Sequence, residues 1–298
     1  MRNLFATFTL IALAGSVLAQ PTINGVFTPA DGWGAARALQ DTNTQFGNAS
    51  GPNTGNELDG LFITSDASNL YVGLTGNIQD NNAIVVFLDT RPGGSLVLNT
   101  DPGLANCPNS QVPTLIREYS GSDLDLLADY SFLISVGIFP GQSSSQLVMA
   151  CDITDLVAKT NVPLGIGFVN GGSTLSASAN TGVVVGSDNS NAIGVGDYGV
   201  SPTPVLPGED PSAVTTGFEI KIPRSLIGLG PNSTLFAFAN LTNNANDGGG
   251  CFRTGYASNQ SLPGVGGLSN LGPFSSDGPF LPFSLVTGTQ AVGPIAIP

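Results

Sequence analysis

The feature that most constrains the fold is a series of short apolar runs, each of strand length and each ended by turn-forming residues. No stretch keeps the 3.6-residue apolar period of an amphipathic helix for three turns, whereas β-rich runs recur along the chain. The runs "LDGLFITSD" and "NLYVGLTG", joined through "DASN", predict a hairpin. "DYSFLISVGIF" and "QLVMACDIT", on either side of "PGQSSS", predict a second hairpin.

Two further runs indicate how the strands are buried. "AIVVFLDT", residues 83–90, is apolar on both faces, as expected of a central strand. "GFEIKIP" alternates, which predicts Phe218, Ile220 and Ile222 facing inward and Glu219 and Lys221 facing outward. Strands are also expected in "STLFAFANLT" and in "LPFSLV", residues 281–286, and a single helical turn in "IPRSLIG".

Polar, Gly-rich connectors separate these runs, at 41–57, 92–112, 170–214 and 242–279. Within the third connector, Val183 to Val185 predict a long hairpin excursion. Many short strands with turn signals between them predict an all-β fold, a single large antiparallel β-sandwich of the jelly-roll kind with long Gly/Asn/Ser-rich loops. No linker divides the chain, so residues 20–298 are expected to form one domain.

The N-terminus, "MRNLFATFTLIALAGSVLAQ", has the pattern of a signal peptide. Arg2 gives the positive region, residues 4–13 the apolar region, and Val17-Leu18-Ala19 the cleavage site. The alternative is an N-terminal membrane anchor, but the apolar run is shorter than a membrane span, and no later segment approaches that length. We therefore expect residues 1–19 to be removed and the protein to be secreted.

Composition excludes several functional classes. The chain has 8 basic and 21 acidic residues, a formal charge of −13, which argues against nucleic acid or an anionic membrane as a partner. It has no histidine. Catalysis by Ser-His-Asp or Cys-His groups, and zinc or haem held by histidine, are therefore excluded.

The three cysteines are an odd number for an exported protein. Cys151 is in phase with the apolar residues of its strand and is expected to be a buried small side chain. Cys107 and Cys251 lie in loop-like stretches and could form one disulfide, the alternative being three free thiols.

Several stretches of the chain are informative when they are taken together: "INGVFTPADGWGAARALQDTNTQFGN", "NELDGLFITSDASNLYVGLTGNIQDNNAIVVFLDTRPGG", "AVTTGFEIKIPRSLIGLGP", "LFAFANLT" and "GYASNQSLPG". They resemble a group of secreted bacterial proteins with a single DOMON-like sandwich. That sandwich is related in shape to family 9 carbohydrate-binding modules. The resemblance implies a binding or surface role, with glycans as the ligand class. Those modules hold sugars between aromatic rings, which makes Trp33 a ligand candidate; the alternative is that Trp33 packs the first strand onto the sandwich.

Five acidic residues fall within one hairpin-plus-strand unit, Glu57, Asp59, Asp66, Asp80 and Asp89. Such oxygen ligands suit calcium, the one candidate cofactor, with Glu57, Asp59 and Asp89 as the principal ligands. The alternative is turn chemistry, in which Asp bonds backbone N–H groups of its own turn. For Asp89, before "TRPGG", we expect a structural acid that accepts N–H groups in the turn and pairs with Arg91; metal binding comes second and catalysis third.

Two other groups of side chains are candidates. Asp123 and Asp125 would share one face of a strand, which fits an exposed face better than the carboxylate pair of a glycoside hydrolase. "NDGGGCFRTGY" contains Arg253 and Tyr256, candidates for ligand contact; the alternative is a long hairpin turn.

Together these observations favour a secreted, non-enzymatic β-sandwich that needs no cofactor, with a binding or structural role outside the cell. Its expected partners are an extracellular glycan or a cell-surface component. A carboxylate-based glycoside hydrolase and a self-associating surface or matrix component are the alternatives.

The first prediction concerns export. The secreted protein should begin at Gln20, because cleavage is expected after Ala19. N-terminal sequencing or intact mass of secreted material checks this, and material that retains residues 1–19 would contradict it.

Overall fold

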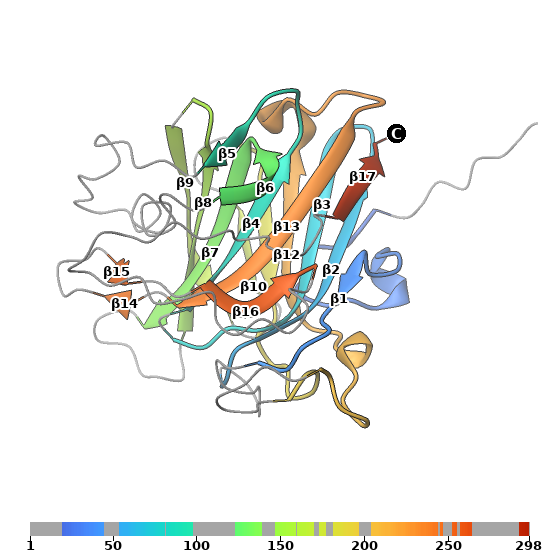
Figure 1. The fold of residues 1–298 in the computed structure, drawn as a ribbon, viewed down its shortest axis with the longest axis vertical. Helices are drawn as coiled ribbons and strands as arrows, with labels where there is room; N and C mark the ends of the chain where they lie inside the picture. The colour runs from blue at the N-terminus through green and yellow to red at the C-terminus, as the bar shows by residue number, and fades with distance from the viewer. Residues whose placement is uncertain are drawn as a thin grey trace, which may run out of the picture.

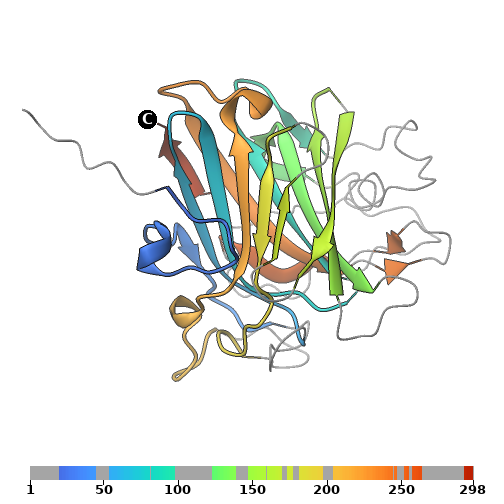
Figure 2. The same ribbon diagram turned by 180° about the vertical axis from the view of Figure 1, so that it is seen from behind.

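The structure is a computed structural model of the 298-residue chain. It describes residues 20–44, 54–80, 82–97, 123–138, 147–158, 160–169, 173–176, 181–196, 204–243, 245–246, 252–254, 257–263 and 292–297. Two antiparallel sheets pack face to face, as Figures 1 and 2 show from opposite sides. The predicted all-β sandwich is confirmed.

The first sheet has six strands. In spatial order they are β1 (Ala38–Leu39), β2 (Glu57–Ser65), β3 (Asn69–Asn77), β12 (Gly217–Pro223), β11 (Val184–Ser187) and β10 (Ser173–Ser176).

The second sheet has seven strands. In order they are β16 (Ala257–Leu262), β13 (Thr234–Asn243), β4 (Asn82–Asp89), β7 (Tyr130–Ile138), β8 (Leu147–Asp155) and β9 (Thr160–Phe168), with β17 (Val292–Ala296) also bonded to β13.

The remaining elements are short. Two small ribbons pair β5 (Ser95–Val97) with β6 (Asp123–Ala128), and β14 (Ala245–Asn246) with β15 (Phe252–Thr254). The helical turns are η1 (Pro29–Asp31), η2 (Pro211–Ala213) and η3 (Arg224–Ile227). The turn η3 coincides with the helical turn predicted from "IPRSLIG".

The strand β4 is buried on both of its faces. Residues Ala83 to Leu88 are all at most 1% exposed. One face joins the main core between the sheets, to which both sheets contribute. On the other face, the Phe87 ring stacks on Phe238 of β13, with ring centroids 6.2 Å apart. The prediction of a central strand is confirmed, because β4 lies between β13 and β7 in the sheet and both of its faces are buried.

Both predicted hairpins form. β2 pairs with β3 and β7 with β8, each antiparallel. The excursion predicted around Val183 to Val185 is the β10–β11 hairpin, which the first sheet takes up because β11 also pairs with β12. The predicted strand at 281–286 lies outside the described residues. β16, with the sequence "ASNQSL", lies within a predicted connector and was missed because it lacks alternating apolar residues.

Glu219 faces outward from the sheet, as predicted, but it does not reach solvent. The N-terminal segment covers it and leaves it fully buried. Its carboxylate accepts hydrogen bonds from the backbone N–H of Asn24, from that of Gly25 at 2.6 Å, and from the indole N–H of Trp33 at 2.6 Å. Burial raises the pKa of Glu219 to about 7, while these N–H donors act to lower it.

A glycine opposite Glu219 makes room for this cover. Gly73 of β3 is the cross-strand partner of Glu219, and the rings of Phe27 and Trp33 lie over it. A Cβ atom at Gly73 would be 2.3 Å from Cε1 of Phe27. The missing side chain therefore lets the rings of Phe27 and Trp33 lie directly on the sheet, where they form a cluster with Tyr71 of β3.

Within the described residues, no helix combines the length and the apolar character that crossing a bilayer requires.

The second prediction tests the cover over the first sheet. Glu219→Gln should lower the free energy of unfolding by about 2–4 kcal/mol, because the amide NH₂ cannot accept from the N–H groups that Glu219 now satisfies. Urea unfolding measures this effect. Asp41→Asn is the control, since it removes one charge from an exposed residue. Equal stability of the two variants would contradict the role of Glu219.

Candidate functional site

The turn after β4 is held by a different acid from the predicted one. Asp129, between β6 and β7, is fully buried, and its carboxylate accepts the N–H of Thr90 at 2.8 Å and that of Arg91 at 2.9 Å. The guanidinium of Arg91 pairs with Asp129 at 3.2 Å and with Asp155 at 3.0 Å. The predicted role of Asp89 in capping this turn is therefore wrong, as is its predicted pairing with Arg91.

The sequence contains a signal for Asp129. It is the one acid between two β-rich runs, in "LLADYSF". Its own N–H donates to the carbonyl of Leu88, which places its side chain beside the turn that follows β4. Asp129 is 39 positions from Thr90 along the chain and takes this place only because β4 and β7 are neighbours in the sheet.

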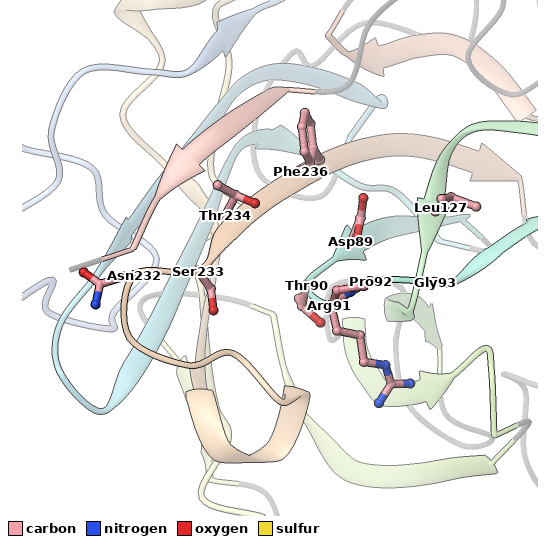
Figure 3. A pocket seen from close by; sticks show the side chains of 10 residues that line it. All are labelled: Asp89, Thr90, Arg91, Pro92, Gly93, Leu127, Asn232, Ser233, Thr234 and Phe236. Carbon is pink, nitrogen blue, oxygen red and sulfur yellow. The ribbon is translucent and has the colours of Figure 1, made fainter.

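Asp89 instead lies in the wall of an open pocket of about 420 Å³ (Figure 3). The pocket lies at the end of β4 and the start of β13, where Asp89 and Phe236 are direct cross-strand partners on one face of the sheet. Pro92 and Leu127 add apolar surface, and Leu127 is 41% exposed. Further polar lining comes from Asn232, Ser233 and Thr234.

The described lining of the pocket contains one carboxylate, Asp89, and one cation, Arg91, whose guanidinium is paired with Asp129 and Asp155. In Figure 3, the Asp89 and Phe236 side chains extend in one direction and the Arg91 side chain in the other. Among the described residues, none donates a hydrogen bond to the Asp89 carboxylate. Burial, and then the nearby charge of Asp129, raise the pKa of Asp89 to about 6. The carboxylate is therefore an acceptor whose partner comes from solvent or from a ligand.

The three principal calcium candidates do not come together. Glu57 is paired with Asn77 at the end of β3, and the chain reaches β4 shortly afterwards, at Asn82. Asp89 is at the other end of β4, which is 8 residues long and therefore about 23 Å at some 3.3 Å per residue. Glu57 and Asp59 thus lie at one end of the sandwich and Asp89 at the other. No group of three or more acidic or cysteine side chains in the described part of the chain could hold a metal ion.

The other two acids of the predicted cluster have structural contacts. The Asp66 carboxylate accepts the N–H groups of Ser68 and Asn69 at 2.6 and 2.7 Å, which is the predicted turn chemistry. These bonds, with one from the Tyr71 hydroxyl, lower the pKa of Asp66 against the opposing effect of burial. Asp80 accepts the N–H of Ile138 at 3.1 Å, across the sheet and not in its own turn.

Of the ligand candidates, the structure describes one in full. Trp33 is 8% exposed and packs with Phe27 and Tyr71, so it offers no open aromatic platform. Arg253 is on β15, but its side chain lies outside the described residues, as does Tyr256. Asp123 and Asp125 are on β6, and their side chains are likewise not described.

The cysteines are described only in part. Cys107 and Cys251 lie outside the described residues. Cys151 is a free, buried thiol in the main core, as predicted from its phase on β8, and burial raises its pKa.

Comparison with protein-family models, with curated proteins and with solved structures gave no match for this chain. The class that the fold defines is a two-sheet antiparallel β-sandwich.

The third prediction separates the two acids beside the turn. Asp129→Asn should lower the free energy of unfolding by about 2–4 kcal/mol, because it breaks a buried ion pair and places an NH₂ group against two N–H donors. Asp89→Asn should preserve stability at pH 7 or increase it. Its folded-state pKa lies above the ordinary carboxyl value, so ionisation of Asp89 opposes folding as the pH rises from about 4 through about 6.

Urea unfolding of both variants at pH 4.5 and pH 7.5 measures these effects. The advantage of Asp89→Asn over the wild type should be larger at the higher pH. If Asp89→Asn destabilises the protein as much as Asp129→Asn does, the assignment of the two roles is wrong.

Proposed function

We propose that this protein is a non-enzymatic binding protein and that its ligand is a neutral, polyhydroxylated molecule of the glycan class. The proposed site is the pocket beside Asp89. The observation that carries the proposal is a pair of neighbouring side chains. The Asp89 carboxylate on β4 accepts no hydrogen bond from the described residues, and the partly exposed ring of Phe236 lies beside it on β13.

The chemistry of the lining suits such a ligand. A carboxylate accepts hydrogen bonds from hydroxyl groups, and bonds to a charged acceptor contribute about 1.5–3 kcal/mol each. Ser233 and Thr234 add hydroxyls that both donate and accept. The ring of Phe236 and the side chains of Pro92 and Leu127 offer apolar surface to the C–H face of a sugar.

The pocket disfavours anionic ligands. Asp89 is the one acidic side chain in the described lining, and the guanidinium of Arg91 is engaged by Asp129, Asp155 and the Tyr130 hydroxyl. The chain as a whole carries a formal charge of −13, which adds long-range repulsion. A neutral ligand therefore meets less electrostatic opposition here than a phosphate or a carboxylate would.

The hydrolase alternative has weaker support at this pocket. Glycoside hydrolysis commonly uses two carboxyl groups that face each other across the bond to be broken, about 5–9.5 Å apart. The described lining supplies one carboxyl group, that of Asp89. Nearby Asp129 is fully buried, and its carboxylate already accepts hydrogen bonds from the backbone N–H groups of the turn. A single carboxylate fits recognition better than this chemistry. The N-terminal pattern further supports a role outside the cell.

The fourth prediction tests the site. In a screen of neutral mono- and oligosaccharides followed by calorimetry, at least one should bind to the wild type. Asp89→Ala and Phe236→Ala should each weaken that binding about tenfold or more, which corresponds to about 1.4 kcal/mol. Asp210→Ala, which removes an exposed acid from another loop, should leave the affinity unchanged. Binding that survives both pocket substitutions would exclude this site, and failure of the whole panel would exclude the ligand class.

A further inference from the structure

The N-terminal segment that covers the first sheet contains an asparagine followed by a glycine. The chain has two such pairs, Asn24-Gly25 and Asn170-Gly171, and the second lies outside the described residues. In an Asn-Gly pair the backbone nitrogen of the glycine can attack the side-chain amide carbon of the asparagine, because glycine has no Cβ atom to hinder the approach. The surroundings of the pair decide whether a fold assists this reaction.

The fold requires both residues of the first pair. Gly25 has φ +83°, and a Cβ atom there would be 2.2 Å from the backbone nitrogen of Asp188, so a larger residue would be strained. Asn24 has a separate role, because its Oδ1 accepts the N–H of Val26 at 2.9 Å. The reactive pair is therefore built into the attachment of the N-terminal segment to the sheet.

The hydrogen bond from Val26 folds the Asn24 side chain back along its own backbone. In such an Asx-turn the side chain takes the place of a backbone turn, so its amide carbon lies beside the peptide bond between residues 24 and 25. The attacking nitrogen, that of Gly25, belongs to this peptide bond. The same Val26 N–H is placed to stabilise the negative charge that develops on Oδ1 during the attack.

A base is in contact with the attacking nitrogen. The N–H of Gly25 donates to Oε2 of Glu219 at 2.6 Å, and the N–H of Asn24 donates to the same oxygen. The indole N–H of Trp33 holds the other oxygen, Oε1, at 2.6 Å and so fixes the carboxylate in this orientation. Because burial raises the pKa of Glu219 to about 7, this carboxylate accepts a proton more readily than an exposed glutamate does.

The amide group that would leave is on the outer side of the pair. Nδ2 of Asn24 lies 3.4 Å from Oδ1 of Asp31, and the Asn24 side chain is half-buried, whereas Gly25 is buried. Ammonia released from this position can therefore reach solvent, and water can reach the group that remains.

We propose that Asn24 is a site of self-modification, at which Glu219 promotes conversion of the asparagine to aspartate or isoaspartate. The Gly25 nitrogen gives its proton to Glu219 and bonds to the side-chain amide carbon of Asn24. The bond from that carbon to Nδ2 then breaks, and Nδ2 takes the proton from Glu219 and leaves as ammonia. Water opens the resulting succinimide at either carbonyl group. One amide and one water thus become one carboxyl group and ammonia, and Glu219 is regenerated.

The product weakens the attachment of the N-terminal segment. A carboxylate at position 24 would face Asp31 and lie close to Glu219, where the protein now has a neutral amide. These like charges repel each other. Isoaspartate would in addition lengthen the backbone of the segment. Modification is therefore expected to loosen the cover over the first sheet.

The fifth prediction concerns the rate of this conversion. Near neutral pH, Asn24 in the folded protein should convert at least about tenfold faster than Asn24 in the same chain denatured in urea, because the fold supplies the base and the bent side chain. Peptide mapping by mass spectrometry measures both rates, since replacement of NH₂ by OH changes the mass of the peptide. The peptide that contains Asn170 is the internal reference for the effect of urea on Asn-Gly chemistry.

Glu219→Gln should abolish the excess of the folded rate over the denatured rate. This holds whether or not the variant folds fully, because the base is lost in one case and the bent geometry in the other. Asp41→Asn, which removes an exposed acid from the same segment, should convert as the wild type does. A folded rate equal to or below the denatured rate, or an excess that Glu219→Gln retains, would overturn the proposal. The glycan experiment is independent, because its pocket is on the second sheet.

Discussion

The burial of β4 on both faces is the constraint on which the rest of the structure depends. Its residues from Ala83 to Leu88 have no polar side chain to present to water, so the strand is stable only with a strand on each edge and a layer on each face. β13 and β7 supply the edges, the first sheet supplies one face, and the Phe87–Phe238 pair belongs to the other. The ends of β4 are then fixed, and the pocket beside Asp89 lies at one of them.

The protein has few cations, so it compensates its buried acids in different ways. Asp129 is paired with Arg91 and two backbone N–H groups. Glu219 relies on N–H donors alone, from the N-terminal segment and the Trp33 indole. Asp59 accepts the N–H of Val195 and retains a second buried oxygen without a described donor. The first two acids are therefore parts of the fold, because described donors satisfy their carboxylates.

The acids at the two ends of the sandwich differ in their access to solvent. The pocket beside Asp89 is open and combines a carboxylate with apolar surface, as expected where a ligand enters and leaves. Glu57 and Asp59, at the other end of the sandwich, are fully enclosed. The open arrangement is the one suited to recognition.

The sequence by itself determined the strands, both hairpins and the two-sided burial of β4, because these depend on local alternation and on turn residues close in the chain. It also placed Asp66 in its turn and Cys151 in the core. Tertiary structure alone decided what covers an outward-facing residue and which distant groups meet. Alternation predicted the face of Glu219 correctly, but the segment that buries it begins 195 residues earlier. The turn after β4 takes its acid from Asp129, and Asp59 meets Val195, 136 residues away. Such contacts depend on how the sheets close on each other, which no local pattern specifies.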